Sequence, residues 1–265
     1  MKQAILVVSF GTSYNESRKK TIEAIEKTLQ ETFRDYDFYR AFTSRIIIKK
    51  LKERDNLSID GVSEALEKLV LKGYRRVIIQ PTLVMGGEEY DRILSVVEQY
   101  NHRFDKIEMG MPLLTDEKDY LSLVSILIED TKEYMEVGTE ILFMGHGTEH
   151  EANRTYSHLA DVLKTKGYLN CHVGTVEAVP TFEMVKQEID KKVSKQVILQ
   201  PLMVVSGDHA HNDMAGKDAD SWKSQLEKDG YEVTCRLKGM GELEGVREMF
   251  LLHAQRAKKN MEEIQ

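Results

Sequence analysis

Three residues with metal-binding side chains each follow a predicted strand in the second half of the chain. His146 comes directly after the apolar run 141–144, and Glu177 and His209 follow similar stretches further on. Because parallel strands end on one edge of a sheet, the three side chains could converge there. Two imidazoles and one carboxylate suit a borderline divalent metal such as cobalt, nickel, zinc or iron. Three protein ligands would also leave open positions for a substrate.

The sequence around His146 has a second interpretation. Glycines flank it, and polar, helix-compatible residues follow. The glycines would leave room for a flat ligand and permit unusual backbone angles, but a tight strand-to-helix turn with an exposed histidine has the same pattern. The three possible ligands are also dispersed, without a short motif such as His-Glu-x-x-His. Of the other histidines, His211 could be a partner of His209 or an exposed loop residue, and His253 is expected on the surface.

Short apolar runs alternate with segments of helical spacing along the whole chain. Residues 4–9 form a continuous apolar run, as in a buried parallel strand, and apolar residues then recur at helical intervals from Ile22. Further strands are expected at 38–42, 77–80, 107–109, 171–176, 197–200 and 231–235. Further helices are expected at 58–71, 91–100, 120–134, through Leu159, after Pro180, through Trp222 and from 242 to about 259. This alternation predicts an α/β fold with parallel sheets.

The two halves of the chain repeat one pattern. Residues 77–81 (VIIQP) match 197–201 (VILQP) at an offset of 120, and 9–12 (SFGT) match 145–148 (GHGT) at an offset of 136. The loops therefore differ in length between the halves. A glycine followed by tyrosine also closes a helical pattern three times, at 73, 167 and 230. Two similar α/β lobes joined near 111–117 would enclose a cleft between their strand ends.

Composition narrows the classes of function. The chain has 265 residues, 41% hydrophobic and 31% charged, which is enough for two ordinary domains with cores. Its net charge of −7 argues against a nucleic-acid partner, because phosphate binding needs a basic face. It has no apolar run of membrane-spanning length and no signal-peptide run, so a cytoplasmic protein without a membrane partner is expected. Cys171 and Cys235 match no zinc or redox spacing and are expected to be reduced thiols.

The first half carries different residues at the matching positions. Phe10 stands where the second half has His146, and Glu89 stands where it has His209. A carboxylate there could move protons or guide a cation, although an acidic first helical turn has the same sequence. Residues 9–13 lack the glycine pattern of a phosphate-binding loop, so no nucleotide cofactor is expected. Basic residues near strand ends could meet an anionic ligand or be solvated surface charges: Arg18, Lys19, Lys20, Arg40, Arg45 and Arg154.

Four segments carry a resemblance to a known family. They are 144–148 (MGHGT), 200–214 (QPLM followed later by GDHAHNDM), 9–13 (SFGTS) and 85–91 (MGGEEYD). Together they resemble the class II, ATP-independent tetrapyrrole chelatases, and among these the anaerobic cobalt chelatases of cobalamin biosynthesis. The resemblance covers essentially the whole chain.

The resemblance implies an architecture and a site. It implies two lobes, 1–114 and 115–240, each a four-stranded parallel sheet flanked by helices, with the active-site cleft between them. A final helix, 241–265, would pack back on the first lobe. Co²⁺, as the substrate metal, would be held in the second lobe by His146, Glu177 and His209, with His146 and Glu89 as catalytic residues. The implied substrate contacts are Phe10, Gly11, Thr12, Ser13, Met85, Gly86 and Gly87.

The implied activity is ATP-independent insertion of Co²⁺ into sirohydrochlorin or precorrin-2 in anaerobic cobalamin biosynthesis, by an enzyme of the lyase class. The metal-free tetrapyrrole would carry eight carboxylates. Alternatives remain open. The same tetrapyrrole could receive nickel or iron, the chain could bind a tetrapyrrole or metal without catalysis, or a zinc hydrolase could use the same three ligands. A homo-oligomer is also compatible with the sequence.

Overall fold

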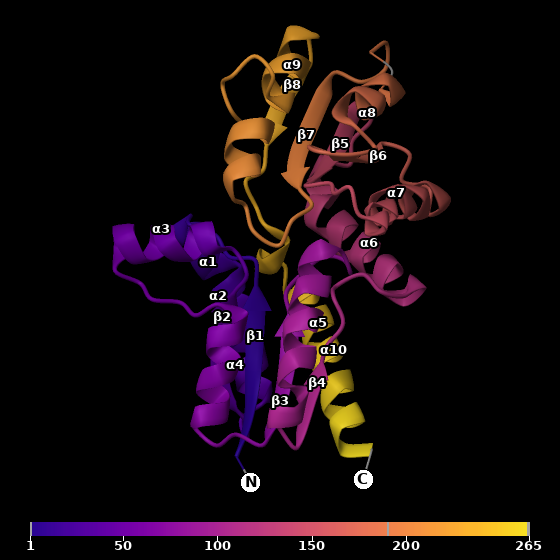
Figure 1. Cartoon of the computed structure of the whole chain (residues 1–265). Coiled ribbons are helices and arrows are strands. Elements are labelled where there is room, and N and C mark those ends of the chain that lie inside the picture. Colours follow the sequence, from indigo (N-terminus) through magenta and orange to yellow (C-terminus); the bar gives the residue numbers. More distant parts are fainter. Residues whose placement is uncertain (1, 190, 264–265) are drawn as a thin grey trace. The chain divides into compact units, whose positions relative to one another are not determined.

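Two compact units make up the chain. The computed structural model describes residues 2–189 and 191–263. Contacts group residues up to Thr115 with residues from Glu244 onward as unit 1, and Asp116–Leu243 as unit 2. Each unit has one four-stranded parallel sheet flanked by helices (Figure 1). The predicted fold class, two similar α/β lobes, is therefore confirmed. No helix within the described ranges is long and apolar enough to cross a membrane.

Unit 1 has the strand order β2-β1-β3-β4. Its strands are β1 Gln3–Ser9, β2 Asp37–Phe42, β3 Arg76–Pro81 and β4 Lys106–Met109. Its helices are α1 Asn15–Lys20, α2 Ile22–Thr32, α3 Arg45–Asp55, α4 Val62–Leu71, α5 Glu88–Tyr100, the 3₁₀ turn η1 Asn101–Arg103 and α10 Glu244–Glu263. Helix α10 packs against α2, β3 and β4. It therefore covers part of the sheet of unit 1.

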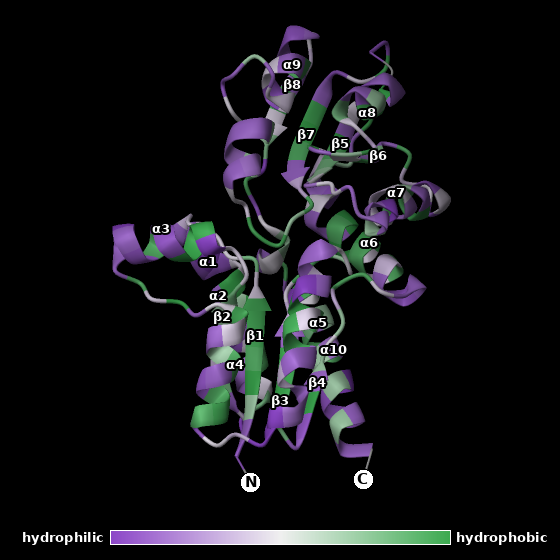
Figure 2. Cartoon of the chain, in the orientation of Figure 1, coloured by the Kyte–Doolittle hydropathy of each residue, from purple (hydrophilic) through white to green (hydrophobic). Residues whose placement is uncertain are grey.

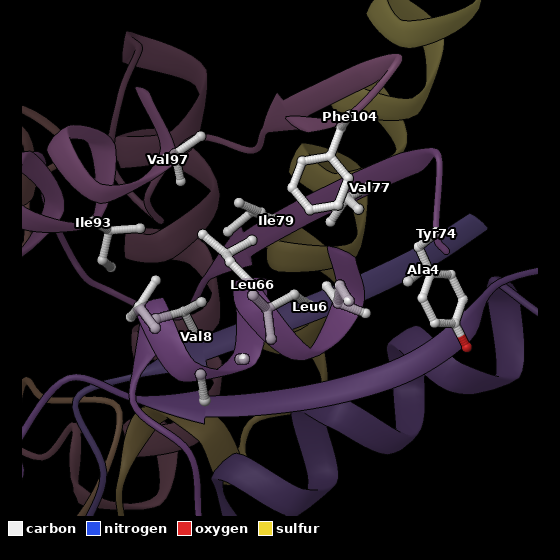
Figure 3. Packing of buried hydrophobic residues seen from close by; sticks show 14 residues of the cluster. Ala4, Leu6, Val8, Leu66, Tyr74, Val77, Ile79, Ile93, Val97 and Phe104 are labelled. Atoms are coloured by element: carbon white, nitrogen blue, oxygen red, sulfur yellow. The ribbon is translucent and has the colours of Figure 1, made fainter. Parts of the chain in front are cut away.

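The centre of unit 1 is buried on both faces of its sheet. Leu6 and Val8 of β1, Ile79 of β3 and Leu66 of α4 belong to one buried cluster (Figure 3). Ile5, which points to the opposite face of β1, is also 0% exposed. Each such side chain contributes roughly 1.5–3 kcal/mol by leaving water. The continuous apolar run of β1 (Figure 2) is therefore explained by burial on two sides.

Unit 2 has the corresponding strand order, β6-β5-β7-β8. Its strands are β5 Thr139–Gly145, β6 Cys171–Thr175, β7 Gln196–Pro201 and β8 Glu232–Cys235. Its α-helices are α6 Glu117–Thr131, α7 Arg154–Thr165, α8 Phe182–Glu188 and α9 Trp222–Lys228. Short turns complete it: 3₁₀ turns η2 Lys132–Tyr134, η3 Glu151–Asn153 and η5 Met240–Glu242, and a π-turn, η4 Ala210–Met214. In its core the rings of Phe182 and Trp222 stack, with centroids 4.6 Å apart.

The three glycine–tyrosine pairs end helices in one way. At α4, Gly73 has φ +75° and its N–H donates to the carbonyl of Val70, while the N–H of Tyr74 donates to Leu69. The corresponding bonds follow α7, at residues 167–168, and α9, at 230–231. This pair of hydrogen bonds is the Schellman motif, and the left-handed backbone conformation at its first residue favours glycine. The helix ends predicted from these pairs are confirmed.

The structure corrects three expectations. Helices α1 and α3 were not predicted: α1 has no apolar residue, and in α3 the run Ile46–Ile48 masks the helical spacing between Ile47 and Leu51. The helix expected at 58–71 begins only at Val62, where the side chain of Glu64 accepts a hydrogen bond from the N–H of Gly61 at 2.9 Å. His253, expected on the surface, is 2% exposed within α10, and its Nδ1 lies 3.2 Å from the carbonyl oxygen of Met111.

Candidate metal centre

His146 and Glu177 lie side by side because two strands continue their pairing past their ends. Gly145 closes β5, and its carbonyl accepts a hydrogen bond from the N–H of Val176 at 3.1 Å. The carbonyl of His146 then accepts one from the N–H of Glu177 at 2.9 Å. These bonds fix the backbones of both residues at the carboxyl edge of the sheet. Nε2 of His146 lies 3.6 Å from Oε2 of Glu177.

Both glycines beside His146 are required by the surrounding structure. A Cβ on Gly145 would lie 2.2 Å from the ring of Tyr156, and a Cβ on Gly147 would lie 2.8 Å from the backbone nitrogen of Ala178. Gly147 also has φ +89°, which favours glycine. The buried hydroxyl of Tyr156 accepts a hydrogen bond from the N–H of Gly147, and burial raises the pKa of this tyrosine. The backbone around His146 is therefore held tightly.

A π-turn positions His209. The turn spans Ala210–Met214, and its two end residues are fully buried, which anchors it to the sheet. Nδ1 of His209 lies 2.6 Å from Oδ2 of Asp213. A carboxylate in this place accepts a hydrogen bond from Nδ1 and leaves Nε2 available to bind a metal. Single π-turns occur often at functional sites, and this one gives His209 a fixed orientation.

The structure brings the three predicted ligands of unit 2 together. One donor atom from each of His146, Glu177 and His209 lies within 4.8 Å of the other two, and no other such group of His, Cys, Asp or Glu occurs among the described residues. The two imidazole centroids are 4.6 Å apart. The side chains are 48%, 54% and 31% exposed, respectively. Donors that share an ion lie about 2.0–2.2 Å from it, which small rotations of exposed side chains achieve. The arrangement can hold a divalent cation with an accessible face.

Unit 1 repeats this backbone with different side chains. The N–H of Ser44 donates to the carbonyl of Phe10 at 3.2 Å, as Glu177 does to His146. The strand offset then places Glu89 at the position matching His209. A phenyl ring, a hydroxyl and one carboxylate form no comparable ligand set. The two units therefore share the backbone arrangement at these positions, whereas the metal-binding side chains occur in unit 2.

The other predicted site residues lie in unit 1, at the carboxyl ends of β1 and β3. Phe10 is 48% exposed, whereas Thr12 and Ser13 are buried. Gly11 has φ +99°, and a Cβ there would lie 2.6 Å from the ring of Phe42. Glu89 lies in the first turn of α5, where it accepts a hydrogen bond from Arg92 at 2.6 Å. The loop between β3 and α5 contains Met85, which is half-buried, Gly86, which is exposed, and Gly87, which is buried.

Sequence reasoning missed two supporting residues. Asp213 stands four residues after His209, a spacing that brings side chains together on a helical turn, but the preceding residues show no helical apolar pattern. Tyr156 is 3% exposed and its ring packs against Gly145, a contact that no local sequence motif predicts. His211, the other histidine of the π-turn, is half-buried.

Comparisons with known proteins identify the family of the chain. The sequence profile of the cobalt chelatase (CbiK) family matches residues 3–259. A sirohydrochlorin cobaltochelatase of Salmonella typhimurium is 39% identical over 257 residues, covering 97% of each chain. The sirohydrochlorin cobaltochelatase CbiKC of Nitratidesulfovibrio vulgaris is 31% identical over 254 residues, covering 95% of this chain and 89% of the relative.

Solved structures share the fold. The sirohydrochlorin chelatase SirB from Bacillus subtilis subspecies spizizenii, solved in complex with cobalt, superposes with a TM-score of 0.68 at 15% identity, covering 100% of this chain and 98% of SirB. At that identity the likeness concerns the fold alone. The family profile and the relatives above 30% identity carry the assignment: the chain belongs to the cobalt chelatase family.

Proposed function

We propose that this protein inserts Co²⁺ into sirohydrochlorin without ATP. The observation that carries the proposal is the cluster of His146, Glu177 and His209, open to solvent, in a member of the cobalt chelatase family. Relatives that cover nearly the whole chain are named sirohydrochlorin cobaltochelatases. The donor set of two imidazoles and one carboxylate suits Co²⁺.

The first step is capture of the metal. The two histidines supply neutral imidazole nitrogens and Glu177 supplies a carboxylate oxygen, so the protein meets the ion with three donors. The remaining coordination positions hold water, which a ring nitrogen can displace. The exposed side chains of His146 and Glu177 form the accessible side of the site. His209, backed by Asp213, is the more fixed of the two imidazoles.

The second step exchanges a metal for two protons. Insertion replaces two pyrrole N–H bonds by metal–nitrogen bonds, so two protons must leave the ring for each Co²⁺ that enters. When His146 releases the ion, its nitrogen lone pair becomes available to take one of these protons. Imidazole exchanges protons readily near neutral pH. His146 thus acts as ligand and proton acceptor. When the ion leaves Glu177, the carboxylate of this residue can accept the second proton.

Unit 1 supplies the other proposed roles. Residues 10–13 and 85–87 are proposed to contact the tetrapyrrole, with the exposed ring of Phe10 as an apolar surface for the macrocycle. Glu89 is proposed to assist proton transfer. Glu89 lies in the first turn of α5, and Arg92 provides a neighbouring positive charge at 2.6 Å.

The test is metal insertion followed by absorption spectroscopy under anaerobic conditions. Protein, Co²⁺ and sirohydrochlorin are mixed, and the spectrum of the cobalt product is expected to appear at a rate proportional to protein concentration. His146→Ala is expected to lower this rate more than about 100-fold, since it removes a metal ligand, a larger change than loss of a supporting residue. His102→Ala, which removes an exposed histidine of η1 in unit 1, serves as the control. Near-normal insertion by His146→Ala would refute the assignment.

Other outcomes identify the alternatives. A spectral shift on binding, without metallated product, would indicate a non-catalytic binding protein. Faster insertion of Ni²⁺ or Fe²⁺ than of Co²⁺ in a competition assay would reassign the metal, and faster reaction with precorrin-2 would reassign the tetrapyrrole. Hydrolysis of model esters by zinc-loaded protein, with no reaction of tetrapyrroles, would indicate a hydrolase.

A further inference from the structure

Helix α3 is an element of unit 1 that has no counterpart in unit 2. In unit 1 the N–H of Phe42 donates to the carbonyl of Asp60 at 2.9 Å, and in unit 2 the N–H of Thr175 donates to Pro180 at 2.7 Å, so these positions match. Fifteen residues separate Ser44 from Asp60, whereas two separate Glu177 from Pro180. The added residues form α3, which follows the carboxyl end of β2 and projects sideways from the sheet (Figure 1). An insertion there lies at the ligand-binding edge of the fold.

A pocket lies between α3 and the loop after β1. Its volume is about 410 Å³, and it is lined by Ser13, Tyr14, Asn15, Lys50 and Arg54. Ser13 belongs to the loop 10–13, which the proposed function assigns to substrate contact. A ligand group that enters this pocket therefore lies next to residues proposed to bind the macrocycle.

Arg54 ties the two walls of the pocket together. Its Nη2 donates to the carbonyl of Ser13 at 2.6 Å and to Oδ1 of Asn15 at 3.1 Å. A second guanidinium, from Arg18, donates to the same Oδ1 at 2.8 Å. Because two donors occupy the amide oxygen, the Nδ2–H₂ group of Asn15 is fixed as a donor; one of its N–H groups bonds to the carboxylate of Asp55, and the other remains for a ligand. The charge of Arg54 is balanced by its hydrogen bonds to Asp55.

Lys50 supplies the excess positive charge. Its side chain is exposed, and within residues 2–189 and 191–263 it forms no ion pair or hydrogen bond. Helix α3 carries five cations and two anions, a net charge of +3 in a chain of net charge −7. Close to the pocket, Arg54 pairs with Asp55 and Arg18 pairs with Glu23, which leaves the single charge of Lys50. One excess cation with nearby N–H donors matches a carboxylate, while a phosphate dianion beside Asp55 would be repelled.

We propose that this pocket binds one carboxylate arm of the tetrapyrrole, through Nζ of Lys50 and the Nδ2–H of Asn15 that does not bond to Asp55. The inference rests on the proposed function, because it takes the substrate to be a macrocycle that carries several carboxylates. Arg54 acts as a positioning residue that holds the loop at Ser13 and the amide of Asn15. Unit 1 thereby recognises the rim of the substrate through an element that unit 2 lacks.

The test compares two lysines on one helix. Lys50 lines the pocket, and Lys52, two residues on, points about 200° away around α3. Lys50→Ala is expected to raise KM for sirohydrochlorin about fivefold to tenfold with kcat nearly unchanged, since one charge-assisted hydrogen bond is lost. Lys52→Ala is expected to leave KM unchanged, and Lys50→Arg is expected to restore most of the loss. Equal effects of the two alanine variants would overturn the proposal, because a general electrostatic field would explain them.

Binding of metal-free substrate separates this inference from the proposed function. The Kd for sirohydrochlorin, measured by fluorescence quenching without cobalt, is expected to rise in Lys50→Ala by the same factor as KM. Its methyl ester is expected to bind wild type and Lys50→Ala equally. An unchanged Kd for the free acid would overturn the pocket assignment even where wild type inserts cobalt. Competition by millimolar inorganic phosphate against wild type but not Lys50→Ala would also overturn it, in favour of a site for small anions. Absence of metallation by wild type would instead overturn the proposed function.

Discussion

At the scale of single residues, the two imidazoles of the metal cluster differ in how firmly they are held. His209 is 31% exposed, and the carboxylate of Asp213 fixes its Nδ1 at 2.6 Å. His146 is 48% exposed, and its nearest charged neighbour is Glu177 at 3.6 Å. A supporting carboxylate fixes the orientation of the imidazole ring that it contacts. We therefore expect His209 to retain the metal longest and His146 to release it to the ring.

The first prediction concerns Asp213. Asp213→Asn keeps a hydrogen-bond acceptor behind His209 but removes its charge, and Asp213→Ala removes both. Loss of such a supporting group lowers metal affinity about 10-fold to 100-fold. The alanine variant is expected to lose affinity about 100-fold and the asparagine variant about 10-fold. Titration of the visible Co²⁺ band measures the affinity. Asp218→Asn, at an exposed position beyond the π-turn, is the control. Wild-type affinity in Asp213→Ala would show that His209 does not depend on this carboxylate.

The sequence could predict that these three side chains lie together, but not the residues that support them. His146, Glu177 and His209 were recognisable because each follows a strand of one parallel sheet, and such strands end together. Asp213 was not, because its role depends on the π-turn, for which the sequence offers no periodic signal. Tyr156 depends on a tertiary contact under Gly145. The positions of the three side chains follow from the strands that precede them, whereas their orientation depends on local turns and packing.

At the scale of elements, a half-buried ion-pair network joins α6 to β7 and to the segment after β8 in unit 2. Asp130, at 10% exposure, accepts hydrogen bonds from Gln200 of β7 at 3.0 Å, and from Arg236 at 2.9 Å and Lys238 at 2.5 Å after β8. Burial acts to raise the pKa of Asp130, but these three donors outweigh it and hold the pKa below its usual range. This network explains the glutamine of the second Gln-Pro motif.

The second prediction concerns stability. Asp130→Asn is expected to lower the free energy of unfolding at pH 7 by about 2 kcal/mol, because Arg236 and Lys238 lose their hydrogen bonds to a half-buried charged group. The neighbouring Glu129→Gln, which breaks an exposed pair with Lys132, is expected to cost less than about 0.5 kcal/mol. Urea unfolding measures both values.

The pH dependence has a definite sign. Because the folded pKa of Asp130 is lowered, its contribution is complete above the unfolded pKa, near 4, and is lost as pH falls through the lower folded value. The difference between wild type and Asp130→Asn should therefore shrink below pH 4. Equal losses for the Asp130 and Glu129 variants at pH 7 would contradict this assignment.

The elements themselves were unequally predictable. The strands were found because burial on both faces requires continuous apolar runs, as in β1, and the helix ends because Gly73, Gly167 and Gly230 stand at left-handed positions. Helix α3 was not predicted because the β-branched run Ile46–Ile48 masks the helical spacing of its one fully buried residue, Leu51, and Ile46 remains 80% exposed. An element that buries little apolar surface leaves little periodicity in the sequence.

At the scale of the whole molecule, two units with the same strand order carry different chemistry. Unit 2 has the cluster of three metal-binding side chains, and unit 1 has Phe10, Ser44 and Glu89 in the matching places together with the basic helix α3. We interpret this as specialisation after duplication, in which one unit presents the metal and the other recognises the tetrapyrrole. The interpretation depends on one claim, that His146, Glu177 and His209 bind a single cobalt ion.

Anomalous diffraction at the cobalt absorption edge, on crystals soaked in Co²⁺, tests that claim most directly. We expect one strong peak about 2.0–2.2 Å from a nitrogen of His146, a nitrogen of His209 and an oxygen of Glu177. The peak should be absent from crystals of His146→Ala that keep the same fold. A strong cobalt peak elsewhere, with none between these three side chains in a preparation that inserts cobalt into sirohydrochlorin, would contradict the account.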